Sequence, residues 1–212
     1  MIESVLQVAR VVIGAKIFYD VCNDTLNPPL EGIEYPDKQY QEYTDQISRI
    51  SGIAEKVLVR QSPSFKGKPM VFSKGNRFLG HLQICIPQET PLSPSILKFA
   101  SIHELGHLSN HHSLIIGAII ATNVALFAMP FIPIKVVCST FAMSALSFIP
   151  LYRWMERQAD DFAFDHCSKE ILKEAFQNDG SHRKQDSWLG ALFAKYVAVG
   201  NEEKRKLARS MK

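Results

Sequence analysis

The stretch His103-Glu104-Leu105-Gly106-His107 is the part of this 212-residue chain around which the rest must fold. On an α-helix, residues four apart lie one above the other on the same face, so the two histidines can present ring nitrogens to one metal ion. Glu104 lies one step around the helix, where it can take a proton from a metal-bound water without being a ligand. The pattern predicts a zinc-type site on a helix.

The residues before this stretch predict where that helix begins. Ser93 can cap the first turn with its hydroxyl, and Pro94 suits the first helical position. An apolar side that could bury the helix is supplied by Ile96, Leu97, Phe99, Ala100 and Ile102.

A second stretch, residues 153–163, is rich in acidic side chains at helical spacing. A catalytic zinc site usually has three protein ligands and one open position, and Glu156 can be the third ligand. Asp160 is four residues further on and faces the same way. It could accept a hydrogen bond from the second ring nitrogen of a ligand histidine. The alternative is a solvated helix face.

The H-E-x-x-H and E-x-x-A-D motifs together resemble the membrane-associated zinc metallopeptidases of the HtpX and CAAX prenyl protease type, which are gluzincins. The resemblance covers about residues 40–195. It implies one Zn²⁺ bound by His103, His107 and Glu156, with Glu104 as general base and Asp160 supporting a ligand histidine. It also implies a zinc metalloendopeptidase that hydrolyses peptide bonds of protein substrates.

Members of that family often carry His-Pro, and an arginine six residues after the histidine, downstream of the second motif. Here the match is partial, because Arg183 follows His182 and Trp188 stands where the arginine would be. His182 is a candidate for contact with the substrate or transition state, and a surface histidine is the alternative. Tyr152 and Tyr196 are further candidates for stabilising an oxyanion.

Net charge and cysteine spacing exclude several classes of protein. The net charge is +3 and no basic run is interleaved with aromatic residues, so nothing indicates a nucleic-acid partner. The four scattered cysteines show no C-x-x-C spacing, which favours a reducing compartment over a disulfide framework. They are Cys22, Cys85, Cys138 and Cys167.

The predicted fold class is α+β and mainly helical, with a gluzincin-like core, a small antiparallel sheet and an inserted hydrophobic hairpin. Residues 1–36 are predicted to form an N-terminal helix over 4–19 and an irregular connection. That helix is too short and too charged to span a bilayer. It is expected to pack on a core, with a position on a membrane surface as the alternative.

Residues 37–112 and 153–212 are predicted to form the peptidase domain. Helices are expected near residues 37–50, 153–166, 168–177 and 186–198, with a mostly antiparallel sheet over 56–87. The resemblance implies that the edge strand of this sheet lines the cleft, which would place residues 78–86 beside an extended substrate. Plain core packing of that strand is the alternative.

His111 and His112 follow the first motif and suggest a second metal site. Adjacent helical residues point about 100° apart, so they cannot act as an i, i+4 pair. They are interpreted as polar residues at a helix end or a membrane boundary.

Residues 113–152 are predicted to form a hydrophobic hairpin. Lys135 is its only charged residue, and Pro130 and Pro133 mark the bend. A bilayer-spanning helix needs about 20 apolar residues, so residues 113–134 qualify and residues 136–152 are short. A membrane hairpin is favoured, and a buried pair of core helices is the alternative.

Arg153 and Arg157 follow the hairpin and indicate a cytoplasmic catalytic side. A soluble cytoplasmic protein is the alternative location. The alternative function is a catalytically inactive zinc-binding or membrane adaptor protein of the same fold. A misfolded membrane protein, a prenylated peptide and a specific protein partner all remain open as substrates.

Overall fold

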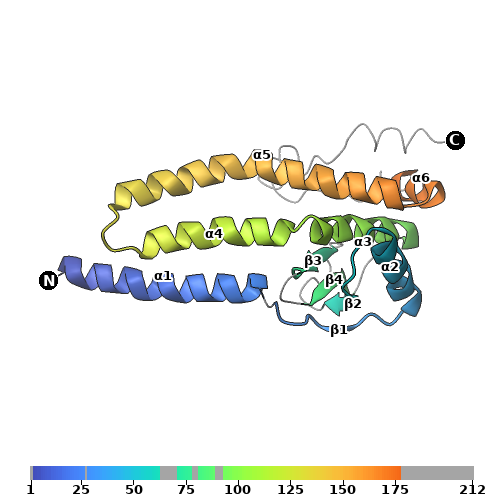
Figure 1. The fold of residues 1–212 in the computed structure, drawn as a ribbon, viewed down its shortest axis with the longest axis horizontal. Coiled ribbons are helices and arrows are strands. Elements are labelled where there is room, and N and C mark those ends of the chain that lie inside the picture. The colour runs from blue at the N-terminus through green and yellow to red at the C-terminus, as the bar shows by residue number, and fades with distance from the viewer. Residues whose placement is uncertain (1, 27, 63–70, 78–80, 89–92, 178–212) are drawn as a thin grey trace.

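A long helical arm joins a mixed α/β body in this protein (Figure 1). A computed structural model of the chain describes residues 2–26, 28–62, 71–77, 81–88 and 93–177. The arm consists of α1 (Ile2–Leu26), α4 (His112–Ala128) and the first half of α5 (Ile134–His166). The body contains the second half of α5, a sheet, and the helices α2 (Lys38–Ile50), α3 (Pro94–Ser109) and α6 (Lys169–Gln177).

The sheet has four strands in the order β1-β2-β4-β3 and is mixed. They are β1 (Ile33–Glu34), β2 (Val57–Ser62), β3 (Phe72–Lys74) and β4 (Leu82–Pro87). β2 and β4 are parallel, while β1–β2 and β3–β4 are antiparallel. The prediction of a small, mostly antiparallel sheet is therefore confirmed at the two outer pairs and wrong at the central pair, which is parallel.

The predicted edge strand is also in a different place. β4, which overlaps the predicted strand over residues 78–86, lies between β2 and β3, and all six of its residues are buried. β3 is the edge strand instead. Side-chain alternation shows that a segment is a strand, but a strand's place in the sheet depends on how the chain crosses over.

Local capping explains where two body helices begin. The Asp37 carboxylate accepts a hydrogen bond from the backbone N–H of Gln39 at 2.9 Å, and this caps α2. The Ser93 hydroxyl accepts one from the N–H of Ile96 at 3.3 Å, with Pro94 in the first turn of α3. The two predicted helix starts are confirmed, since caps depend only on neighbouring residues.

The hydrophobic core lies between the sheet and α3. Apolar side chains of β2 and β4 pack against one face of α3, and α5 covers another face of that helix. The fully buried members from the strands and α3 are Val57, Val59, Leu82, Ile84, Ile86, Ile102 and Leu105. The helix with the H-E-x-x-H motif is therefore held on both sides.

α5 is one continuous helix that links the arm to the body. It contains Pro150 and extends without a break from the hairpin bend to His166, so the hairpin's second run and the Glu156 segment share one axis. α3 and α4, in contrast, are separated by a 56° bend. His111 lies at that bend in the left-handed region, with a φ of 56°.

α1 belongs to the arm rather than to a core, so the prediction that it packs on a core is wrong. It lies along α4, with Gly14 against Ala128 and Gly117 against Thr25 (Figure 1). The Arg10 guanidinium donates to the carbonyl oxygens of Met129 at 3.1 Å and Ile132 at 3.2 Å, at the far end of α4. Small residues at such contacts allow two helices to approach closely.

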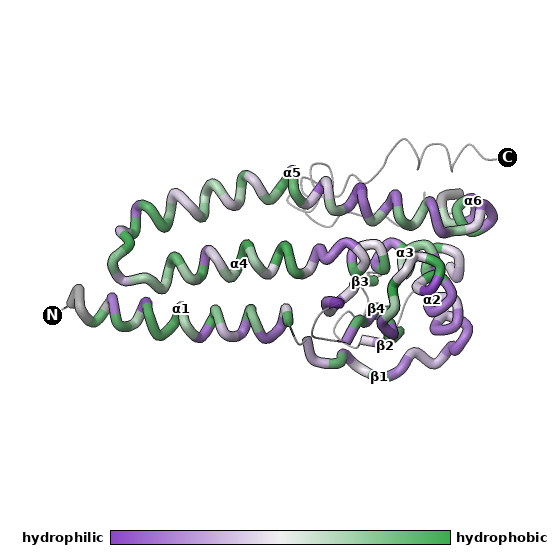
Figure 2. The backbone as a smooth tube through the Cα atoms, in the orientation of Figure 1, coloured by the Kyte–Doolittle hydropathy of each residue, from purple (hydrophilic) through white to green (hydrophobic). Residues whose placement is uncertain are grey.

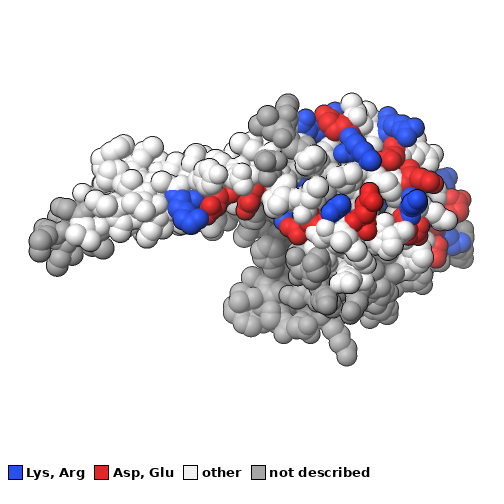
Figure 3. Space-filling model, turned by 90° about the horizontal axis from the view of Figure 1, so that it is seen from below, with Lys and Arg blue, Asp and Glu red and all other residues white. Residues whose placement is uncertain are grey.

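Apolar side chains cover the outside of the arm, as the hydropathy colours of Figure 2 and the mainly uncharged arm surface in Figure 3 show. Only 6 % of the most apolar stretch of α5 is buried, which contradicts a buried pair of core helices. Exposed large hydrophobic residues of α4, the first half of α5 and their connection are Ile120, Met129, Phe131, Ile134, Val136, Phe141, Met143, Leu146 and Ile149.

Within the described residues, α5 alone is long and apolar enough to cross a membrane by itself. α4 has 17 residues, and it passes the same test only when combined with α3 across the bend. The first apolar run was predicted to be long enough to span a bilayer and the second to be short. The structure shows the reverse, because α4 ends at Ala128 and the helix of the second run continues into the body as part of α5.

The predictions for the C-terminal region fall within the described residues only as far as Gln177. α6 begins after Ser168, whose hydroxyl accepts a hydrogen bond from the N–H of Ile171 at 3.4 Å, as expected. The predicted helix over residues 186–198 lies outside the described residues, as do His182 and Tyr196.

The contact between α1 and α4 gives a first prediction. A Cβ on Gly14 would lie 2.5 Å from the Cβ of Ala128, so Gly14→Val should push the two helices apart and destabilise the protein by about 1–3 kcal/mol. Ala15→Val makes a similar change at the next, exposed position and should leave the Tm nearly unchanged. The Tm of each variant is measured by thermal unfolding in detergent. Equal Tm values for Gly14→Val and Ala15→Val would contradict the close packing of α1 on α4.

Candidate metal centre

The three predicted ligands come together from two helices, His103 and His107 on α3 and Glu156 on α5. The two Nε2 atoms are 3.1 Å apart. Glu156 Oε2 is 3.3 Å from Nε2 of His103, and Oε1 is 3.5 Å from Nε2 of His107. The three donor groups therefore face one common point.

The spacing of these donors suits a tetrahedral cation. Metal–ligand bonds of about 2.0–2.1 Å in a tetrahedral centre place neighbouring ligand atoms about 3.3–3.4 Å apart. The observed separations of 3.1, 3.3 and 3.5 Å lie around that value. Two imidazoles and one carboxylate can thus hold one metal ion here with little rearrangement.

Gly106 explains how two separate helices bring their ligands so close. A Cβ at this position would lie 2.9 Å from the Cα of Ala159 and 3.0 Å from the Cβ of Phe162 on α5. Any side chain would separate the helices. Glycine within the motif therefore allows α5 to approach α3 closely enough for Glu156 to reach the histidines.

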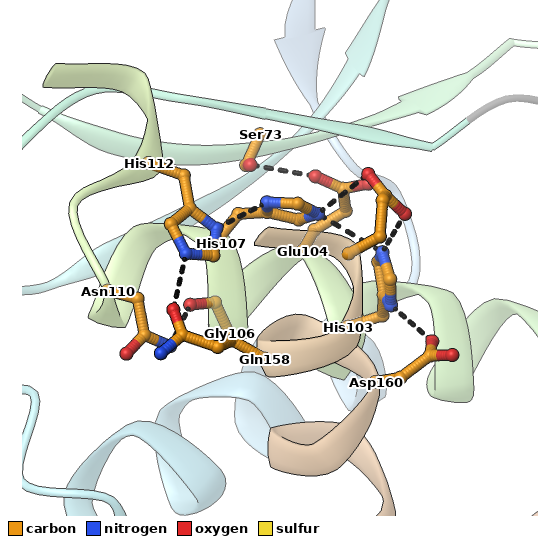
Figure 4. Close-up of polar contacts among 10 residues, drawn as sticks. Ser73, His103, Glu104, Gly106, His107, Asn110, His112, Gln158 and Asp160 are labelled. Atoms are coloured by element: carbon orange, nitrogen blue, oxygen red, sulfur yellow. Dashed lines mark hydrogen bonds and ion pairs between the residues drawn. The ribbon is translucent and has the colours of Figure 1, made fainter. Parts of the chain in front are cut away.

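Asp160 makes the contact that the family resemblance implies. Its carboxylate accepts a hydrogen bond from Nδ1 of His103 at 2.9 Å, and the residue is fully buried (Figure 4). With the proton on Nδ1, the lone pair of His103 is on Nε2, which faces His107 and Glu156. Such an outer hydrogen bond sets the tautomer and orientation of a ligand histidine.

The electrostatics of the centre favour a cation. Burial lowers the pKa of His103, but hydrogen bonds to Asp160 and Glu156 outweigh it and raise the pKa to about 10. Burial raises the pKa of Glu156, yet hydrogen bonds from His103 and His107 bring it well below its ordinary value. The carboxylates thus stabilise positive charge at the point where the ligand atoms meet.

His112 is part of the centre, which corrects its interpretation as a polar residue at a helix end or membrane boundary. Its side chain is buried, with Nδ1 2.7 Å from Nδ1 of His107 and Nε2 3.0 Å from Oε1 of Gln158 (Figure 4). Helical spacing does not reveal this contact, because the chain turns at His111 and returns His112 towards His107.

A cleft of about 340 Å³ opens beside the ligands. Its walls come from the edge strand β3, from α3 and from the base of the arm. The Ser73 hydroxyl of β3 donates to Oε2 of Glu104 at 2.7 Å, a contact that sequence patterns did not predict. Tyr152 also lines the cleft, while the other oxyanion candidates lie outside the described residues.

No known protein-family model and no curated protein sequence matches this chain. The resemblance to gluzincin peptidases therefore depends on the two sequence motifs alone.

The raised pKa of His103 predicts the pH dependence of metal binding. At pH 7 the metal-free imidazole is protonated, so a divalent metal must displace about one proton and should bind about tenfold more tightly per pH unit between about pH 7 and pH 9. Calorimetry in buffers of different ionisation enthalpy counts the released protons. Binding without proton release would mean that His103 is neutral before the metal arrives.

Proposed function

We propose that the protein is a zinc-dependent metalloendopeptidase that cleaves protein substrates at a membrane. The observation that carries the proposal is the convergence of His103, His107 and Glu156 beside Glu104 on an open cleft. Two histidines and a glutamate with one open position form a typical set for catalytic zinc.

Zinc at this centre would supply a Lewis acid that polarises the scissile carbonyl and makes water more acidic. Ser73 holds one oxygen of Glu104, and we assign the other oxygen to the attacking water. Glu104 would take the proton of that water and pass it to the leaving amine. Tyr152, on the wall of the cleft, is positioned as a candidate donor to the developing oxyanion.

The position of β3 supports a polypeptide as the substrate. β3 is an edge strand and contributes Phe72 and Ser73 to the cleft that contains Glu104. An extended peptide can add to such an edge through main-chain hydrogen bonds, largely independent of its side chains. This arrangement would bring a peptide bond of the substrate next to the general base.

The arm supports a membrane location. The uncharged part of α5, residues 136–152, measures about 25 Å at 1.5 Å per residue, close to the ~30 Å hydrocarbon thickness of a bilayer. α4 lies beside it and α1 lies along α4, and the exposed surface of the three helices is largely apolar. We propose that the apolar hairpin of α4 and the first half of α5 is embedded in lipid and that the body, with most of the charge, remains in water (Figure 3).

The general-base role gives a prediction about activity. Glu104→Gln removes the proton acceptor but no metal ligand, so zinc content should stay at the wild-type level. Hydrolysis of an unfolded protein should fall by at least about 10²-fold. Glu42→Gln, at an exposed position on α2, serves as the matched control and should keep full activity.

Zinc analysis beside a proteolysis assay separates the outcomes. Full activity of Glu104→Gln would refute the assigned role. A wild-type protein that binds zinc and cleaves nothing would favour the adaptor function.

The membrane location gives a prediction about partitioning. Met143 and Leu146 on α5 are 66 % and 70 % exposed, and lysine at the centre of a membrane helix costs about 2.5–3.5 kcal/mol. The double variant Met143→Lys/Leu146→Lys should therefore shift protein from the carbonate-washed membrane pellet to the supernatant. The control Ile33→Lys/Ile50→Lys adds the same charge at body positions that are 65 % and 67 % exposed. This control should remain in the membrane pellet.

If both double variants stay in the pellet to the same extent as wild type, the arm is not the part that holds the protein in lipid.

A further inference from the structure

We infer that His112 and Gln158 form a neutral hydrogen-bond relay that holds His107 in the ring tautomer able to bind the metal. His112 is then a positioning residue, since it acts on the metal only through His107. The inference rests on the proposed function and concerns His112, which lies outside both motifs, and Gln158, which occupies a variable position of the second motif.

The relay consists of two consecutive hydrogen bonds that share the ring of His112. Nδ1 of His107 is 2.7 Å from Nδ1 of His112, and Nε2 of His112 is 3.0 Å from Oε1 of Gln158 (Figure 4). His112 is only 1 % exposed, so its ring can exchange partners with water only at a large cost. The three residues come from α3, α4 and α5, so the relay connects all three helices at the base of the arm.

The chemistry of the three side chains sets the direction of the hydrogen bonds. The amide oxygen of Gln158 can only accept, so Nε2 of His112 carries a proton. In neutral His112, Nδ1 then carries a lone pair and accepts. His107 must therefore donate from Nδ1, and its own lone pair is on Nε2, 3.1 Å from Nε2 of His103.

The opposite direction would disable the second ligand. If His112 donated from Nδ1, His107 would carry its proton on Nε2, the nitrogen that faces the metal position, and it could not coordinate. The acceptor oxygen of Gln158 is therefore the group that decides whether His107 is a ligand.

The relay differs from the contact at the first histidine in its charge. His103 is held by the carboxylate of Asp160, whereas His107 is held by a neutral imidazole and a neutral amide. The centre already contains the carboxylates of Glu104, Glu156 and Asp160. A neutral acceptor orients His107 without adding a fourth negative charge, which would reduce the ability of the cation to polarise a carbonyl.

Zinc affinity of the full chain, measured by competition with a chromogenic chelator, tests the relay. His112→Phe fills the same space without an acceptor and should weaken zinc binding by about 10–100-fold. His112→Asn offers an acceptor oxygen near the position of Nδ1 and should bind more tightly than His112→Phe. His166→Phe is the matched control and should leave affinity unchanged, because His166 contacts the backbone carbonyl and ring of Phe162 on α5 and no residue of the candidate metal centre among the described residues.

Two variants of Gln158 test the direction of the chain without changing a histidine. Gln158→Leu removes the acceptor and should weaken zinc binding, while Gln158→Glu keeps an acceptor oxygen and should preserve it. These variants decide the question if His112→Phe does not fold, as judged by circular dichroism.

Ring ¹⁵N NMR gives a readout that a purely structural role of His112 would not affect. In the zinc-loaded protein, His112 should be protonated on Nε2 and unprotonated on Nδ1, with a coupling across the bond from Nδ1 of His107. The reverse tautomer, or equal zinc affinity of wild type and His112→Phe, would overturn the relay alone. A wild-type protein that binds no zinc would overturn the proposed function and the relay together.

Discussion

The close contact between α3 and α5 at Gly106 is the constraint on which the rest of the structure depends. The absence of a side chain at Gly106 lets the backbones of the two helices approach, with the Cα of Ala159 2.9 Å from where a Cβ would stand. Leu105 and Met155, one residue before Gly106 and one before Glu156, are fully buried and secure the contact. This packing holds the three donor groups of His103, His107 and Glu156 close together.

The same contact relates the metal centre to the arm. α5 supplies Glu156, Gln158 and Asp160 and continues into the arm, so the arm and this part of the centre belong to one helix. Ser113 and Ile116 at the base of α4 line the cleft together with residues of β3. In the proposed membrane-bound state, a polypeptide that enters the cleft would thus lie at the level where the arm leaves the lipid.

Several parts of the fold could be predicted because they depend on neighbours in sequence. Asp37 and Ser93 cap their helices through contacts two or three residues away. The central position of β4 and the place of α1 in the arm depend on contacts between distant segments. A run of apolar residues does not show whether a core or lipid will cover it, since both remove the same side chains from water.

The sequence by itself determined which side chains could hold a metal ion, because helical periodicity places His103 with His107 and Glu156 with Asp160 on common faces. Only the tertiary structure decided what surrounds them. Ser73 reaches Glu104 because β3 is the edge strand, and His112 reaches His107 because the chain turns at His111. Both contacts depend on a change of chain direction, and such changes arise from the packing of distant segments, which local periodicity does not encode.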